Sequence, residues 1–139
     1  MDGADVVTRT AELLAREPWA PGIAGPWLVA LADRHGIEPQ RTLWWDGAPA
    51  VQVHASYDDG MEGLARLEAL LTSAQGEIQL IVSDERPPPW PVWSLQPSAL
   101  VPLLGELPFF EYAVVLEGGA TLVFDTHHNT LLVSHARNR

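Results

Sequence analysis

Apolar residues recur at helical spacing in the first third of the chain. An apolar stripe runs through residues 5–16, and Pro18 and Pro21 follow it. Because such a stripe gives a helix one face for packing, the pattern predicts a first helix there. A second helix is predicted to begin at Pro26, which suits a first helical position, and to end at Gly36, which suits the position just past a helix.

The middle of the chain alternates between strand and helix patterns. Residues 41–45 and 50–57 flank a turn-rich link and predict a hairpin. Apolar and polar residues alternate in the second of these strands, which indicates that one side faces water. Asp58 or Asp59 suits the cap of a third helix that continues to about residue 73.

Prolines dominate the segment that follows. A strand is predicted at residues 78–83, and residues 84–93 are expected to be extended because consecutive prolines favour polyproline II. Residues 95–104 have the pattern of a short helix that opens at Pro97. Pro102 costs roughly 3 kcal/mol in a helix interior, so a kinked or single-turn element is expected.

Residues 111–135 predict a three-stranded antiparallel meander. Gly118 and Gly119 supply the positive φ angles of a two-residue hairpin, which places Tyr112 opposite Asp125. The first strand of the meander is apolar on both faces and is therefore expected inside the sheet.

The second turn of the meander is predicted at His128 and Asn129, since Asn tolerates the left-handed conformation well. That turn would place Thr126 opposite Leu131. Both hairpins then belong to one continuous meander.

These elements predict a single α+β domain over residues 1–139. We expect an antiparallel or mixed sheet of about six strands with helices mainly on one face, the helix at residues 59–73 being the principal cover. A chain of 139 residues, of which 47% are hydrophobic, is long and apolar enough to bury a core by itself.

Composition excludes several classes of protein. The chain has no cysteine, which excludes disulfides and thiolate chemistry. Its first residues lack the basic and apolar regions of a secretory signal, so a cytoplasmic location is expected. The longest uncharged stretch, residues 87–105, is too rich in proline for a membrane helix.

The net charge of −10 argues against nucleic-acid binding, because it repels phosphate and the eight arginines are scattered along the chain. The same charge suits a basic protein partner through long-range attraction. A need for solubility explains the charge equally well.

The predicted second turn gathers residue types that bind metals. His127, His128 and Asp125 lie at the turn, and the register brings Glu111 close. Imidazole and carboxylate ligands suit zinc, iron or manganese. Neighbouring side chains on a strand point to opposite faces, so both histidines bind one ion only if the turn rotates them together. Otherwise one histidine packs, the other is solvated, and Asp125 or Asn129 caps the turn.

No nucleophile beside a base, phosphate-binding glycine loop or helical zinc motif occurs in the sequence. Whether the protein is an enzyme is therefore left open, with the balance against it. His35 and His54 have no chemical partner evident in the sequence and are expected at the surface.

Aromatic residues around two loops form a second candidate site, for protein binding, because Trp and Arg are frequent in interface hot spots. The candidates are Trp45, Arg86, Trp90 and Trp93. The alternative is that these tryptophans fill or cover the core.

Two stretches of the C-terminal part carry a resemblance to a known family. The sequence EYAVV at residues 111–115, followed by LVFDTHHNTLL at residues 122–132, resembles the ending of an uncharacterised bacterial family of small domains of unknown function. That family has an E-Y-aromatic strand, a Trp-bearing strand and an N-H-H-D turn, and residues 78–93 resemble its preceding strand and aromatic loop. This chain departs from the pattern at Thr121, Thr126 and Asn129, where the family has Trp, Asn and Asp. The lost carboxylate counts against a metal site shared with the family.

The resemblance implies no established activity. Small acidic bacterial domains of this type are suspected of being immunity or antitoxin-like partners, which is an analogy. We therefore expect a non-enzymatic protein-binding module with no cofactor. The alternative is a metal-binding domain or a small metal-assisted hydrolase that uses a divalent metal at Asp125, His127 and His128.

Overall fold

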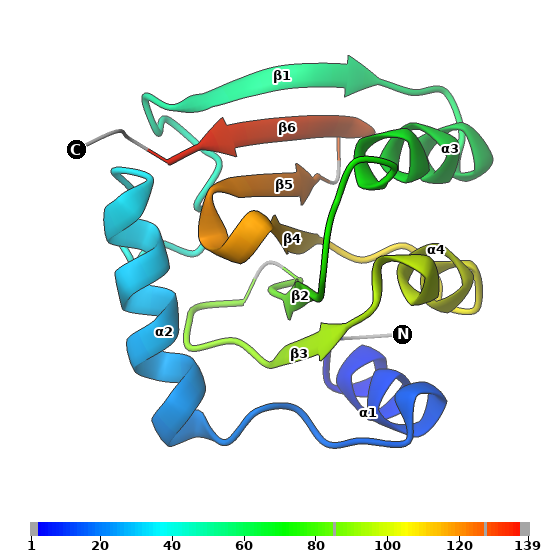
Figure 1. The fold of residues 1–139 in the computed structure, drawn as a ribbon, viewed down its shortest axis with the longest axis horizontal. Coiled ribbons are helices and arrows are strands. Elements are labelled where there is room, and N and C mark those ends of the chain that lie inside the picture. The colour runs from blue at the N-terminus through cyan, green and yellow to red at the C-terminus, as the bar shows by residue number, and fades with distance from the viewer. Residues whose placement is uncertain (1–2, 85, 127, 137–139) are drawn as a thin grey trace.

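The computed structural model describes residues 3–84, 86–126 and 128–136, which contain one six-stranded antiparallel sheet (Figure 1). The strands are β1 (Val51–Ser56), β2 (Ile78–Val82), β3 (Val92–Leu95), β4 (Tyr112–Leu116), β5 (Thr121–Asp125) and β6 (Thr130–His135). They lie in the order β1-β6-β5-β4-β2-β3. The predicted α+β class, the sheet of six strands and the C-terminal meander are confirmed.

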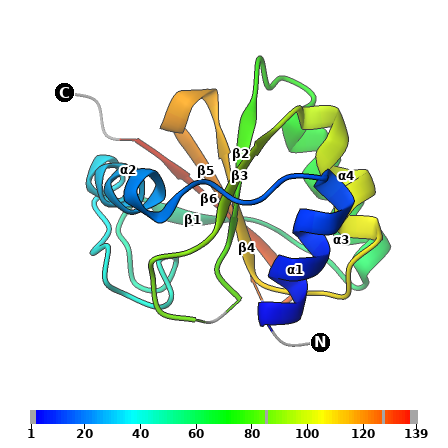
Figure 2. The same ribbon diagram turned by 90° about the horizontal axis from the view of Figure 1, so that it is seen from below.

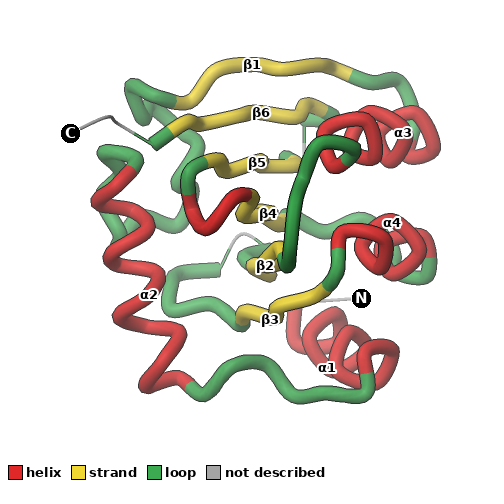
Figure 3. The backbone as a smooth tube through the Cα atoms, in the orientation of Figure 1, coloured by secondary structure: helices red, strands yellow, loops and turns green. Residues whose placement is uncertain are grey.

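Helices cover both faces of this sheet. They are α1 (Gly3–Leu14), α2 (Pro21–Arg34), α3 (Gly60–Leu71) and α4 (Pro97–Gly105). Figure 2 shows α1, α3 and α4 on one side of the strands and α2 on the other, and Figure 3 separates the helices from the strands by colour. The prediction that helices lie mainly on one face is confirmed for three of the four helices of the described chain. None of these helices is both long and apolar enough to span a membrane.

Local capping explains why α3 begins where the sequence predicts. The side chain of Asp59 accepts a hydrogen bond from the backbone N–H of Glu62 at 2.9 Å. In return, the Glu62 side chain accepts from the backbone N–H of Asp58 at 3.1 Å. The first bond satisfies a backbone donor that the first turn of a helix leaves unpaired, and the second pairs the backbone donor just before the cap.

Packing overrides the two internal prolines. Helix α2 begins at Pro21 and continues through Pro26, and α4 is a nine-residue helix that contains Pro102. The predicted start at Pro26 is therefore wrong, and of the two forms expected around Pro102, kinked or single-turn, the single turn is wrong. Each proline removes one helical hydrogen bond, and burial of one apolar face offsets that loss. The buried side chains are Ala24, Leu28, Leu31 and Ala32 in α2, and Leu100, Leu103 and Leu104 in α4.

The predicted strand at residues 41–45 is also wrong, since this segment forms turns. Trp44 explains the difference. Its ring is buried on the α2 face, packs edge-on against Trp90 at 4.9 Å between ring centroids, and donates a hydrogen bond to the backbone oxygen of Pro39. Without that strand, β1 pairs with β6 instead of forming the predicted hairpin.

The first hairpin of the meander has the predicted register, with Tyr112 opposite Asp125. Its turn is a short 3₁₀ element, η1 (Glu117–Gly119), in which both Gly118 and Gly119 have positive φ. The glycines therefore serve the conformation for which the sequence singled them out, in a turn that is longer than predicted.

The second hairpin differs from its predicted register by one residue, because Asp125 and not Thr126 lies opposite Leu131. The loop is longer than a two-residue turn: Thr126 N–H donates to Thr130 O, and Asn129 adopts φ of 54°. Three-residue hairpin loops commonly close on a left-handed residue in this way. His127 lies outside the described residues.

Candidate functional site

The carboxylate of Asp125 lies at the end of β5, on the face of the sheet that α3 and α4 cover. Only 6% of the residue is exposed. Its Oδ1 accepts a hydrogen bond from the Tyr57 hydroxyl at 2.5 Å, and its Oδ2 accepts one from the Tyr112 hydroxyl at 2.6 Å. Tyr112 comes from the neighbouring strand β4, and Tyr57 follows β1, so three separate segments of the chain build this cluster.

The two distances fall in the range of hydroxyl donors on an ionised carboxylate. Burial raises the pKa of Asp125, the hydrogen bonds from Tyr112 and Tyr57 lower it, and the charge of Glu111 raises it, with burial the largest effect. Burial and the Asp125 charge both raise the pKa of the two tyrosines, which keeps their hydroxyls protonated and donating.

Within the described chain, the side-chain groups that donate hydrogen bonds to this carboxylate are the two neutral tyrosine hydroxyls. The two ion pairs found there are Arg9 with Glu12 and Arg66 with Glu62, both on exposed helix surfaces. In its ionised form, Asp125 is therefore a buried charge that no arginine or histidine of the described residues balances. Burying an ion without a counter-ion costs free energy. An ionisable group that is buried in this way beside a cleft is therefore a candidate for a functional site.

A pocket of about 460 Å³ opens onto Asp125. Its walls are the first turns of α3 and the end of α4 with the segment that follows, residues 104–110. Met61 and Phe109 stand at its rim and are 84% and 54% exposed. The volume lies within the range of small-ligand pockets, and the walls are largely apolar around one buried polar group, as in binding sites generally.

Gly63 keeps Tyr57 in this arrangement. A Cβ atom at residue 63 would lie 2.9 Å from the ring of Tyr57, closer than side-chain carbons normally approach. The absence of a side chain lets the ring lie against α3 and direct its hydroxyl to Asp125. The requirement is one of space, since Gly63 lies within regular helix.

The structure separates two carboxylates that the sequence placed in one cluster. Glu111 directly precedes β4 and lines a small cavity with Trp44 and Trp45 on the α2 face, whereas Asp125 lines the pocket on the opposite face. His128 is exposed, and its ring lies edge-on to Trp45 at 6.0 Å. The cause is strand alternation: Tyr112, next to Glu111, occupies the Asp125 face.

No group of three His, Asp or Glu residues suited to a metal ion occurs in the part of the chain that the structure describes. His127 lies outside that part, so metal binding by Asp125, His127 and His128 stays a prediction, whereas Glu111 lies on the other face from Asp125. Elemental analysis of protein purified without chelator would test it.

Two of the predicted protein-binding residues require correction. Trp90 and Trp93 are 5% and 1% exposed and therefore belong to the core. The proline-rich segment directs Trp90 to the α2 face, and Trp93 packs on the α1 and α4 face. Their indole N–H groups donate to the backbone oxygens of Arg86 and Arg16. Arg86 is exposed and Trp45 is half-buried, so both stay accessible.

His35 is fully buried, which corrects the expectation of a surface residue. Its Nε2 lies 2.8 Å from the backbone oxygen of Gly119 and its Nδ1 lies 2.7 Å from Ser134 Oγ. A carbonyl only accepts, so Nε2 donates. Burial lowers the pKa of His35, so the neutral ring accepts from the Ser134 hydroxyl at Nδ1. A serine beside a histidine suggests a nucleophile and its base, but both are buried away from any substrate.

Comparisons with protein-family models, with curated proteins and with solved structures found no match for this chain. The resemblance carried by residues 111–132 accordingly stays a prediction. The pocket at Asp125 is the candidate site that the geometry of the chain itself supports best.

Proposed function

We propose that this protein is a non-enzymatic protein-binding module whose contact surface is the rim of the Asp125 pocket. The observation that carries the proposal is the exposure of Met61 and Phe109 beside that pocket. Aromatic residues and methionine are enriched in protein interfaces, and central hot spots consist of side chains that enter pockets.

The charge of the chain supports a basic partner. A net charge of −10 attracts a basic protein over long range and accelerates its association. Within this class we favour an immunity or antitoxin-like role, in which an acidic protein covers the working surface of a basic one. The predicted cytoplasmic location belongs to this proposal.

Site-specific photo-crosslinking in the native cell tests the proposal. A photoreactive residue is placed at Met61 or Phe109 and, as a control, at Gln52, which is exposed on β1. We expect positions 61 and 109 to capture the same basic protein and position 52 not to capture it. The proposal fails if neither position 61 nor position 109 forms a crosslinked adduct. It also fails if all three positions capture the same proteins equally.

A further inference from the structure

The base of the pocket has unused capacity to accept hydrogen bonds. A carboxylate offers about four lone-pair sites. The hydroxyls of Tyr57 and Tyr112 each donate to a different oxygen of Asp125, which leaves a lone-pair site on each oxygen. A cationic group with several N–H donors suits this base in both charge and hydrogen bonding.

The walls around Asp125 are aromatic. Tyr57, Phe109, Phe110 and Tyr112 all line the pocket, and the rings of Phe110 and Tyr112 lie 5.2 Å apart between centroids. Aromatic rings attract cations, and a planar guanidinium also stacks on them and is less strongly hydrated than an ammonium group. The walls therefore favour arginine over lysine.

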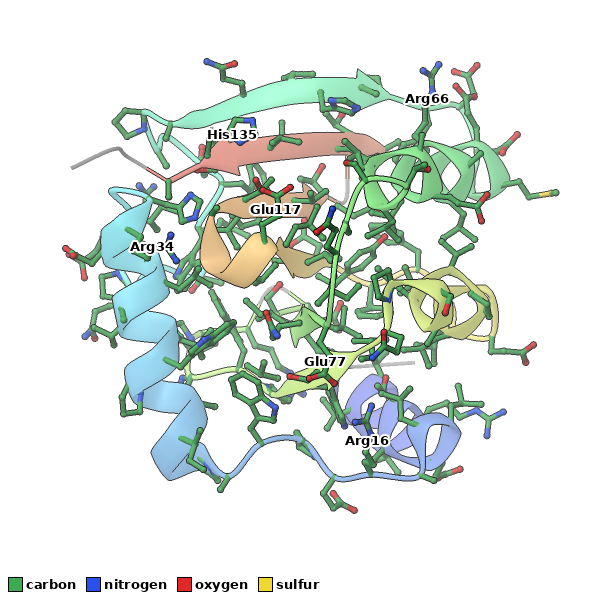
Figure 4. All side chains as sticks on the ribbon, in the orientation of Figure 1. Arg16, Arg34, Arg66, Glu77, Glu117 and His135 are labelled. Atoms are coloured by element: carbon green, nitrogen blue, oxygen red, sulfur yellow. The ribbon has the colours of Figure 1, made fainter. Side chains whose placement is uncertain are left out.

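The helix dipole of α3 opposes a cation at this place, since its N-terminus carries roughly half a positive charge. Asp59 lines the pocket at that end, and its full negative charge outweighs the half charge of the dipole. Arg66, labelled in Figure 4, is exposed and pairs with Glu62 rather than lining the pocket. The entrance is therefore negative overall.

We infer that the pocket receives an arginine side chain of the protein partner, whose guanidinium meets the Asp125 carboxylate beside the aromatic walls. This inference rests on the proposed function and names the part of the partner that is recognised. The hydrocarbon part of the arginine would lie along Leu64 and Leu107, which also line the pocket.

A titration followed by NMR tests the inference on the whole chain. The probe is the peptide N-acetyl-Gly-Arg-Gly-amide, and its control contains citrulline, which has the shape of arginine without the charge. We expect saturable shifts at the amides of Gly63 and Tyr112 with the arginine peptide, and binding at least about tenfold weaker with the citrulline peptide. Equal binding of both peptides, no saturable shift, or equal binding of a lysine peptide would overturn the inference.

Two variants locate the binding. Asp125→Asn keeps an oxygen acceptor without the charge and should weaken arginine binding at least about tenfold. Glu77→Gln removes one charge from the exposed loop before β2 (Figure 4) and should leave binding unchanged. An equal loss of arginine affinity in both variants would mean that overall charge causes the effect, and it would overturn the assignment of binding to Asp125. Because the citrulline comparison uses the unaltered chain, the test does not depend on the folding of Asp125→Asn.

The two proposals fail separately. If residues 61 and 109 form crosslinked adducts but the arginine peptide does not bind, the protein-binding function stands and arginine is rejected as the group that enters the pocket. Arginine binding without any adduct would retain the pocket chemistry and reject the protein-binding function.

Discussion

Glu111 directly precedes β4 and Asp125 ends β5, yet their side chains enter opposite faces of the sheet and meet different surroundings. On the α2 face the tryptophans of two loops leave Glu111 beside a cavity of about 10 Å³, which at most suits a water molecule. On the α3 and α4 face a pocket of about 460 Å³ opens onto Asp125.

The size of the surrounding residues explains this difference. Trp44, Trp45 and Trp90 line the small cavity, whereas Gly60, Gly63 and Gly105 are among the residues that line the pocket. The large tryptophan rings fill the space over Glu111. The glycines, which have no side chain, leave the space over Asp125 open. We therefore propose that the α2 face serves stability and that the open end of the other face serves recognition.

Removal of Trp90 should break the closed face most strongly. Trp90→Ala deletes a buried ring that packs on Trp44, and it should lower the free energy of unfolding by about 3–5 kcal/mol. Chemical denaturation measures the loss. Phe109→Ala at the pocket rim is the control and should change stability by no more than about 0.5 kcal/mol, as at other exposed positions. Similar losses in both variants would contradict the assignment of the two faces.

Removal of His35 should have the next largest effect, because this residue ties α2 to η1 and β6. His35→Ala leaves the Gly119 carbonyl and the Ser134 hydroxyl without their partner and should cost about 2–3 kcal/mol. Burial lowers the pKa of His35 below its ordinary value of 6.5, so below that pH the unfolded chain binds more protons.

The stability that His35 confers should therefore be present above pH 6.5 and decline as the pH falls below it. Denaturation of the parent protein and of His35→Ala at several pH values should show their difference shrinking toward acid. His54→Ala on exposed β1 serves as the control for a histidine that is not buried. A difference independent of pH would rule out a neutral, buried His35.

The sequence predicts those parts of this comparison that depend on neighbouring residues. Gly118 and Gly119 fix the hairpin that sets Tyr112 opposite Asp125. The proximity of Tyr112 to the Asp125 carboxylate therefore follows from local turn chemistry. The cap at Asp59 likewise predicts where α3 begins. Both signals act within a few residues, where backbone geometry decides the outcome.

The remaining parts depend on distant contacts. Tyr57 lies 68 residues before Asp125 in the chain, and no periodic pattern encodes their meeting. The sequence predicts a left-handed Asn129, but it does not determine the length of the loop, and one extra residue shifts the register of β6. The burial of Trp90 depends on which loops cover the α2 face, and the burial of Trp93 depends on how α1 and α4 pack on the other face. Both are decided only by the packed core.

The hydroxyl of Tyr57 should contribute a smaller amount than His35. Tyr57→Phe removes one donor from the buried carboxylate and should lower the free energy of unfolding by about 1.5 kcal/mol, the lower end for bonds to charged groups, because water in the pocket can replace it. Thermal or chemical denaturation measures the change. If the loss matched that of Trp90→Ala, Asp125 would belong to a closed core and not to an open pocket.

The smallest expected effect is the pH dependence that Asp125 itself confers. Burial raises its pKa above the ordinary value of 3.8, so the folded chain holds this proton more tightly than the unfolded chain. Stability contributed at this residue should therefore decline as the pH rises from about 3.8 through the raised pKa of the folded state. Asp125→Asn removes the titrating group, so its stability relative to the parent protein should increase over the same window.

Denaturation of both proteins between acidic and neutral pH measures that difference, with Glu77→Gln as the control for loss of one exposed charge. A relative stability that falls with rising pH would mean that the two tyrosine hydroxyls outweigh burial, and the carboxylate would then need no cation from a partner.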